Sequence, residues 1–332
     1  MKRKLLGVFL LCGSMQPSAS AQQNNSLQSW EIPFSLYKEF MIVVQGSMGD
    51  FDQLNFLIDT GTNPSVVDRR IAKKLHLNGY RTTLPVVSGE IASSEVLIPS
   101  VSIGPVTQPA VRMAAQDLAM FEHELGIRID ALIGLDVLGG RSFRIDYEAR
   151  SMTFGPTNSS SGGGTTFQSE PPFVTVEMKM NQQPLHLLVD TGSSELVLFE
   201  SRIGNDLRNL AGVLRTSRNL QGNFPIREVQ LSETKLGNSS FGARRAFIAS
   251  GGHNQIVFDG LLGVSALHAR RVSFDFERRL FTWQSQDSWI PTMAGDDPHN
   301  CTVAEARAAM SQSLLRIQPG CGQTHPRPMS PQ

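Results

Sequence analysis

The sequence has no excess of charge of either sign, no metal-ligand spacing among its histidines and only three cysteines. Thirty basic residues balance thirty acidic ones, so nothing indicates nucleic acid or an anionic membrane as the main partner. The seven histidines are scattered, and we expect no metal and no cofactor. A chain of 332 residues with 40% apolar residues is typical of a soluble protein with two domains or one bilobal unit.

The N-terminus has the pattern of an export signal. The basic residues Lys2-Arg3-Lys4 are followed by an apolar run from Leu5 to Cys12 and then by the small residues Ala19-Ser20-Ala21. The run is too short to span a bilayer. We therefore expect a signal peptide over residues 1–21, cleavage after Ala21, and a secreted or periplasmic protein without stable membrane insertion. An uncleaved anchor is the alternative.

One tripeptide occurs twice and organises the rest of the chain. Asp59-Thr60-Gly61 follows the apolar run Phe56-Leu57-Ile58, and Asp190-Thr191-Gly192 follows Leu187-Leu188-Val189. In both places the pattern predicts a buried strand that delivers a carboxylate and then turns sharply. The two halves of the chain therefore each contribute one aspartate to a shared site.

Further landmarks repeat at nearly the same offset. Asp59 to Asp190 is an offset of 131, Gly89 to Gly222 and Gly104 to Gly237 are 133, and Gly134 to Gly263 is 129. The closing segment Arg144-Ile145-Asp146-Tyr147-Glu148 is answered by Ser273-Phe274-Asp275-Phe276-Glu277. Such offsets indicate a duplicated domain, with small insertions in loops.

The duplication sets the predicted domain boundaries. We expect an N-terminal lobe over 30–155, a flexible low-complexity linker over 156–171, a C-terminal lobe over 172–285 and a C-terminal extension over 286–332. The extension has no counterpart in the first half and is interpreted as a structural cap. It includes a predicted helix from Val303 to Ile317, and Cys301 and Cys321 could pair with each other in an oxidising compartment.

Within the lobes, local patterns predict strands, a short helix and hairpins. The predicted elements are strands at Phe40 to Gln45 and Leu54 to Ile58, a helix from Val66 to Leu77, a hairpin from Leu84 to Ile98 around Gly89, and a hairpin from Phe143 to Phe154. A hairpin near a site can serve as a lid. Gly89 and its repeat Gly222 are therefore candidate substrate-binding positions.

Two facing carboxylates define the expected chemistry. Like charges in hydrogen-bonding reach cannot both ionise, so Asp59 and Asp190 would share one proton. The ionised carboxylate can take a proton from a water that attacks a carbonyl, while the protonated one donates to the carbonyl oxygen. The hydroxyl groups of Thr62 and Ser193 can reach the outer carboxylate oxygens and favour ionisation.

The remaining motif residues have expected supporting roles. Glycine at Gly61 and Gly192 removes a side chain that would crowd the substrate or the partner loop, and it tolerates unusual backbone angles. Thr60 and Thr191 can form hydrogen bonds across the junction and hold the two loops in register.

These motifs resemble those of the aspartic peptidases. In that family each half carries an apolar-apolar-Asp-Thr-Gly loop and a later apolar-apolar-Gly segment. Here these are Leu57-Ile58-Asp59-Thr60-Gly61 with Leu132-Ile133-Gly134, and Leu188-Val189-Asp190-Thr191-Gly192 with Leu261-Leu262-Gly263. The resemblance covers roughly residues 35 to 284. It implies an all-β, bilobal fold of two duplicated β-barrel-like lobes with a cleft between them, a peptide substrate, and hydrolysis by Asp59 and Asp190.

The chain is most similar to two fused retropepsin-like halves. Each half has only about 100 to 120 residues, and the hairpin around Gly89 lacks the tyrosine found on the first flap of pepsin-like members. The resemblance therefore implies a monomer with an intramolecular pseudo-dimer. Dimerisation of each half with a separate chain is disfavoured, because the linker keeps the second half at high local concentration.

One other interpretation competes with an endopeptidase. A protease-like cleft that binds peptide or glycan without cutting it is the non-enzymatic alternative. Other hydrolase signatures fail, since neither a zinc-binding helix at His123-Glu124 nor a nucleophile elbow at Gly263 is complete. Five further aspartates in turn contexts are expected to be structural: Asp130, Asp136, Asp146, Asp259 and Asp275.

Overall fold

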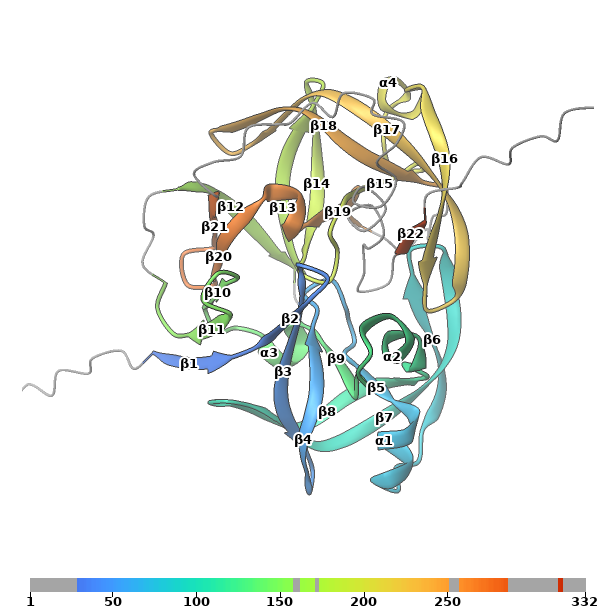
Figure 1. The fold of residues 1–332 in the computed structure, drawn as a ribbon, viewed down its shortest axis with the longest axis vertical. Coiled ribbons are helices and arrows are strands. Elements are labelled where there is room, and N and C mark those ends of the chain that lie inside the picture. Colours follow the sequence, from blue (N-terminus) through green and yellow to red (C-terminus); the bar gives the residue numbers. More distant parts are fainter. Residues whose placement is uncertain (1–28, 158–161, 171–172, 251–256, 286–315, 319–332) are drawn as a thin grey trace, which may run out of the picture.

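A computed structural model describes residues 29–157, 162–170, 173–250, 257–285 and 316–318. The predicted signal peptide, the two C-terminal cysteines and most of the predicted C-terminal helix lie outside the described residues. The described chain consists mainly of strands, and it forms two lobes and a sheet shared between them (Figure 1). The predicted all-β, bilobal fold is confirmed.

The first half contains eleven strands and three helices among its described residues. They are β1 (Trp30–Pro33), β2 (Ser35–Tyr37), β3 (Met41–Met48), β4 (Phe51–Ile58), β5 (Val66–Asp68), α1 (Arg69–Lys74), β6 (Tyr80–Val86), β7 (Gly89–Ile103), β8 (Val106–Gln116), α2 (Ala119–Leu125), β9 (Ala131–Ile133), α3 (Leu135–Leu138), β10 (Phe143–Asp146) and β11 (Ser151–Phe154).

The second half repeats this order with fewer helices. Its described elements are β12 (Gly163–Glu170), β13 (Phe173–Met180), β14 (Gln183–Asp190), β15 (Leu196–Phe199), α4 (Asn205–Arg208), β16 (Gly212–Asn219), β17 (Gly222–Leu236), β18 (Ser239–Ala249), β19 (Gly260–Gly263), the 3-10 helix η1 (Val264–Leu267), β20 (Ala269–Asp275), β21 (Leu280–Ser285) and β22 (Arg316–Gln318).

Each lobe is a small closed barrel. In the first lobe the strands follow the order β3-β4-β9-β5-β8-β7, and β7 pairs back onto β3 to close the sheet. In the second lobe the order is β13-β14-β19-β15-β18-β17, and β17 pairs back onto β13. Closure buries the alternating apolar side chains inside each barrel and leaves few free strand edges.

The lobes are joined by an interlobe sheet in the order β1-β11-β10-β20-β21-β12, which lies at the left of Figure 1. At its centre Phe143 of β10 stands opposite Phe274 of β20, with ring centroids 4.7 Å apart and both side chains fully buried. Burying each such side chain contributes about 1.5–3 kcal/mol. An ion pair between Arg271 and Asp146 also crosses the junction, but Arg271 is 36% exposed, and exposed pairs contribute about 0–1 kcal/mol. Aromatic burial therefore dominates the connection.

The segment from 156 to 171 is only partly the flexible linker that its composition predicts. Residues 163–170 form β12, which pairs with β21 and β13. A Cβ atom on Gly163 would lie 2.2 Å from the indole ring of Trp283. The glycine lets the strand lie flat on this aromatic ring, so a composition typical of a linker here serves close packing.

The predicted helix from Val66 to Leu77 is wrong at its start. Val66 and Val67 lie in β5, and the helix α1 begins only at Arg69. β-branched residues favour a strand, and Asp68 then caps the helix by accepting a hydrogen bond from the Arg70 backbone N–H. The predicted helix ending at Ile317 is also wrong where it can be compared, because Arg316–Gln318 form the strand β22. The predicted hairpins at 84–98 and 143–154 are confirmed.

Candidate active site

The two Asp-Thr-Gly loops meet at the junction between the lobes. Asp59 directly follows β4, and Asp190 is the last residue of β14. Each of these strands runs parallel to the strand that ends in the later glycine segment, β9 or β19. The apolar runs before the aspartates are buried in the barrels. Each Asp-Thr-Gly loop is therefore anchored by the buried strand that precedes it.

The threonines of the two loops form hydrogen bonds across the junction, as predicted. The Thr60 backbone N–H donates to Thr191 Oγ1 at 3.1 Å, and the Thr191 backbone N–H donates to Thr60 Oγ1 at 3.0 Å. Each hydroxyl also donates to a backbone carbonyl of the opposite lobe, Thr60 to Val189 at 2.8 Å and Thr191 to Ile58 at 3.1 Å. All four bonds are buried, so they fix the relative position of the two aspartates.

The two carboxyl groups are buried side by side. Asp59 is fully buried and Asp190 is 2% exposed. A Cβ atom on Gly61 would lie 2.6 Å from Asp190 Cγ, so only glycine permits this approach. On the inner side, the backbone N–H groups of Gly61 and Gly192 donate to Asp59 Oδ1 at 3.0 Å and to Asp190 Oδ1 at 2.8 Å.

This environment disfavours the ionised form of Asp59. Burial, the negative charge of Asp190 and a hydrogen bond between the two carboxyl groups raise the pKa of Asp59 well above the ordinary value of 3.8. Hydrogen bonds from Thr62 Oγ1, at 2.5 Å, and from the Gly61 backbone N–H act in the opposite direction but are outweighed. Two carboxyl groups in this arrangement can serve as acid and base together.

The Thr62 contact with Asp59 was predicted, whereas the contacts of Ser193 are more complex. The Ser193 hydroxyl donates to the Glu195 carbonyl at 3.3 Å and accepts from the Glu195 backbone N–H at 3.4 Å. A contact between Ser193 and the outer oxygen of Asp190 stays a prediction.

A group of polar contacts around Asp136, which was expected to be structural, supports the first loop. Asp136 accepts hydrogen bonds from the Ser65 backbone N–H at 2.7 Å and from the Ser65 hydroxyl at 2.5 Å. The same hydroxyl accepts from the Gly134 backbone N–H at 2.8 Å. A Cβ atom on Gly134 would lie 2.0 Å from the Thr62 carbonyl oxygen, so this glycine allows β9 to pack directly beneath the loop. No sequence motif predicted this supporting role of Ser65.

The flap candidates lie at the tips of two hairpins that touch each other. Gly89 begins β7 after the tip of the β6–β7 hairpin, and Gly222 begins β17 after the tip of the β16–β17 hairpin. Ser88 of the first tip donates to Gln221 Oε1 at 2.6 Å and accepts from Asn219 Nδ2 at 2.7 Å. The two tips therefore meet, one from each lobe.

Each flap tip also packs on an apolar cluster of the opposite lobe. Val87 of the first tip belongs to a second-lobe cluster, and Leu220 of the second tip packs against a first-lobe cluster. The second-lobe cluster includes Leu188, Val197, Phe199, Ile226, Phe247 and Leu261, and the first-lobe cluster includes Phe40, Leu57, Leu84, Leu118, Phe121 and Leu132. The structure thus places two related apolar surfaces beside the two aspartate-bearing strands.

Comparison with known proteins agrees with this geometry. The Aspartyl protease family model matches residues 44–137 and again residues 176–266, more than half of the chain. The chain belongs to the aspartyl protease family. The two separate matches each contain one Asp-Thr-Gly loop and its later glycine segment, as fused halves of an aspartyl protease would. No curated protein is significantly similar to the chain.

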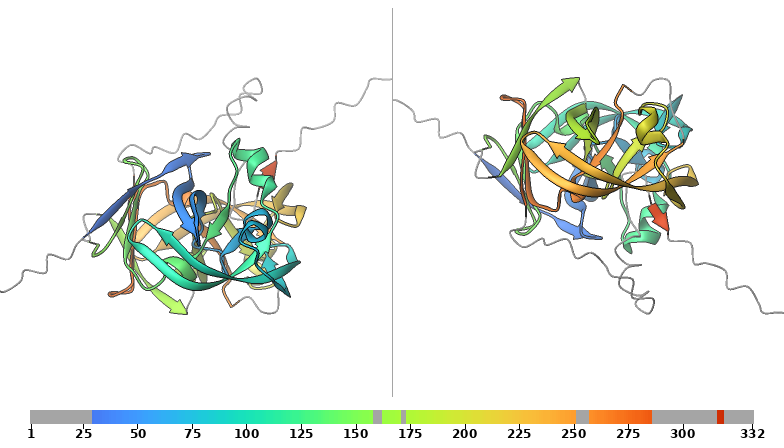
Figure 2. Two further views of the ribbon diagram at one scale, coloured as in Figure 1. Left: turned by 90° about the horizontal axis from the view of Figure 1, so that it is seen from below. Right: turned by 90° about the horizontal axis from the view of Figure 1, so that it is seen from above.

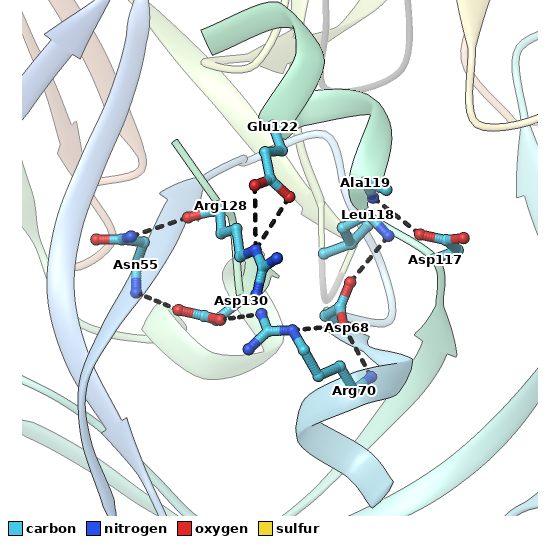
Figure 3. A network of polar contacts seen from close by, with 9 residues as sticks. All are labelled: Asn55, Asp68, Arg70, Asp117, Leu118, Ala119, Glu122, Arg128 and Asp130. Carbon is cyan, nitrogen blue, oxygen red and sulfur yellow. Dashed lines mark hydrogen bonds and ion pairs between the residues drawn. The ribbon is translucent and has the colours of Figure 1, made fainter. Parts of the chain in front are cut away.

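Asp130 and Asp259 form corresponding supports in the two lobes of this aspartyl protease. Asp130 accepts from the Asn55 backbone N–H at 2.8 Å and pairs with Arg70 at 2.5 Å (Figure 3). Asp259 accepts from the His186 backbone N–H at 2.9 Å and pairs with Arg202 at 3.5 Å. Each carboxylate thus connects the strand that leads to Asp59 or Asp190 to an arginine of its own lobe.

In the first lobe this support extends to the start of α2. Arg70 also pairs with Asp68 at 3.6 Å, and Asp68 accepts from the Leu118 backbone N–H at 3.0 Å (Figure 3). Leu118 belongs to the first-lobe apolar cluster, so the network is connected to the cluster against which Leu220 of the second flap tip packs. Within the described parts of the chain, no helix is long and apolar enough to cross a membrane, and no three potential ligands are grouped to hold a metal ion.

Proposed function

We propose that the chain is a single-chain aspartic endopeptidase that hydrolyses peptide bonds through a water activated between Asp59 and Asp190. The observation that carries this proposal is the contact of two buried carboxyl groups, one from each lobe, with a hydrogen bond between them. Burying two acidic groups together is costly unless a proton is shared. The hydrogen bonds between Thr60 and Thr191 across the lobes maintain this arrangement.

The proposed reaction needs only the two aspartates and water. The ionised carboxylate takes a proton from the water as its oxygen attacks the peptide carbonyl, and the protonated carboxyl donates to the carbonyl oxygen. The tetrahedral intermediate then collapses as its nitrogen accepts a proton from the pair, and the carbon–nitrogen bond breaks. Which aspartate holds the proton at each stage is a property of the pair.

The substrate is proposed to be an extended peptide with apolar side chains next to the cleaved bond. Two apolar clusters lie beside the aspartate-bearing strands, and each is covered by the flap tip of the opposite lobe. Apolar side chains of a peptide could replace contacts of Val87 and Leu220 when the flaps open. The same pseudo-symmetry supports a monomer in which the second half acts as the partner of the first.

Replacement of either aspartate tests the mechanism. Cleavage of fluorescently labelled casein is measured from acidic to neutral pH for the wild type, Asp59→Asn and Asp190→Asn. Loss of general acid–base catalysis should lower kcat by about 10²–10⁴-fold in either variant. Asp50→Asn is the matched control, because Asp50 is exposed at the turn between β3 and β4. Near-normal activity in either active-site variant would refute the mechanism.

The same assay decides between the endopeptidase and the binding module. A wild-type protein that cleaves neither casein nor a broad peptide library, but binds peptides, would favour the silent module. An active wild type should show a bell-shaped pH profile, because one carboxyl must be protonated and one ionised. Since the pKa of Asp59 is raised, its basic limb should lie above the ordinary aspartate range.

A further inference from the structure

The short strand β22 pairs with one of the two flap hairpins. Arg316, Ile317 and Gln318 stand opposite Arg218, Ser217 and Thr216 of β16 in antiparallel register. On its other side β16 pairs with β17. In the described chain β22 is thus the last strand of the sheet, and β16 would be an edge strand without it.

The paired part of β16 lies directly before the flap tip. Asn219 and Gln221, which contact Ser88 of the opposite flap, follow the paired residues 216–218 at once. Figure 1 shows β22 at the edge of β16, and both views of Figure 2 show it near α2. The C-terminal strand therefore lies along the hairpin whose tip residue Leu220 packs against the first-lobe apolar cluster.

An edge strand offers a row of backbone N–H and C=O groups to any extended chain. Enzymes and binding domains use such edges to hold peptides by strand addition. The part of β16 farther from the tip, residues 212–215, has no second partner strand among the described residues. Val213 and Leu214 in this part are 55% and 75% exposed. The edge is therefore long enough for a peptide longer than β22.

We propose that β22 is an internal inhibitor, which occupies the edge of the flap strand β16 that an extended peptide substrate uses. This inference rests on the proposed endopeptidase function and goes beyond the structural cap expected from the sequence. Substrate and β22 compete for the same backbone groups, so a substrate binds only the fraction of molecules in which β22 has left. Apparent affinity is lowered by that fraction, whereas the rate of the bound complex is unchanged.

Proline substitution in β22 tests the competition. Ile317→Pro removes a backbone N–H and disfavours strand pairing. In the full chain with labelled casein as substrate, the apparent KM should fall by at least about threefold at unchanged kcat. Thr324→Pro is the matched control, because it places a proline in the same C-terminal extension six residues after Gln318, the last residue of β22.

A peptide added separately gives a second measurement that does not depend on the folding of a variant. A synthetic peptide with the sequence of residues 312–322 should inhibit Ile317→Pro competitively, and the same peptide with proline at the position of Ile317 should not. Equal KM values for the wild type and Ile317→Pro, or no inhibition by the peptide, would overturn the internal inhibitor. A failure of the endopeptidase itself looks different, because then no variant cleaves casein.

Discussion

At the scale of single residues, the site depends on the close approach of the two Asp-Thr-Gly loops. Gly61 allows the Asp190 carboxyl group to lie where any larger residue would place its Cβ. The threonine hydroxyls then make bonds to the opposite lobe, which a valine of the same shape could not make. The chemistry of the pair therefore depends on residues that do not themselves exchange protons.

The raised pKa of Asp59 predicts a specific change of stability with pH. A carboxyl group with a raised folded-state pKa binds its proton more tightly in the folded protein than in the unfolded chain. Its contribution to stability is complete below the ordinary value of 3.8 and is lost as the pH rises toward the folded-state pKa. Asp59→Asn removes this loss. The free energy of unfolding of Asp59→Asn, relative to that of the wild type, should therefore increase as the pH rises above the ordinary value of 3.8.

Urea unfolding at several pH values measures this difference. Asp50→Asn serves as the matched control, because it makes the same substitution at an exposed turn. A difference for Asp59→Asn that shrinks as the pH rises would show that the buried pair is not the source of the effect.

At the scale of elements, the two lobes support their aspartate-bearing strands by the same means but with different strength. Asp130 has a side-chain exposure of 9% and pairs with Arg70 at 2.5 Å, whereas Asp259 is 16% exposed and pairs with Arg202 at 3.5 Å. Asp130→Asn should therefore lower the free energy of unfolding by about 1–2 kcal/mol, allowing for solvent screening at Arg70. Asp259→Asn should cost less than about 1 kcal/mol.

Urea unfolding at neutral pH compares these two matched variants. Asparagine keeps an acceptor for the backbone N–H in both lobes, so the comparison isolates the ion pair. Equal losses, or a larger loss for Asp259→Asn, would contradict the ranking of the two supports.

The elements also show where sequence patterns suffice. Strands, hairpins and the duplication were predictable, because alternation and repeated glycines are local signals. The start of α1 and the strand β12 were not. Val66 and Val67 fit either the apolar face of a helix or a strand, and Gly163 has the appearance of a linker until Trp283 lies against it. Packing partners distant in sequence decide both cases.

At the scale of the whole molecule, the pseudo-twofold relation explains what the sequence could predict of the site. The aspartates, their glycines and the hydrogen bonds between the two threonines could be predicted from the duplicated motif. The contact of Ser88 with Asn219 and Gln221 does not. It is an asymmetric set of polar contacts between two hairpins that lie some 130 residues apart in the chain, and only the folded arrangement brings them together.

The contact between the flap tips predicts how the two flaps separate. Ser88→Ala removes two hydrogen bonds between the lobes and leaves the apolar contacts of Val87 and Leu220 in place. The net loss of about 1 kcal/mol corresponds to a roughly fivefold higher population of open flaps. Amide hydrogen exchange should accelerate by that factor at both tips, but not at the Asp-Thr-Gly loops.

Ser102→Ala is the matched control for this prediction, since Ser102 forms its side-chain contact with Thr107 of the same lobe. Faster exchange in only one of the two tips would mean that the hairpins open independently. Coupled acceleration in both tips would show that access to the aspartates is a property of the two lobes together, because each flap covers the apolar cluster of the other.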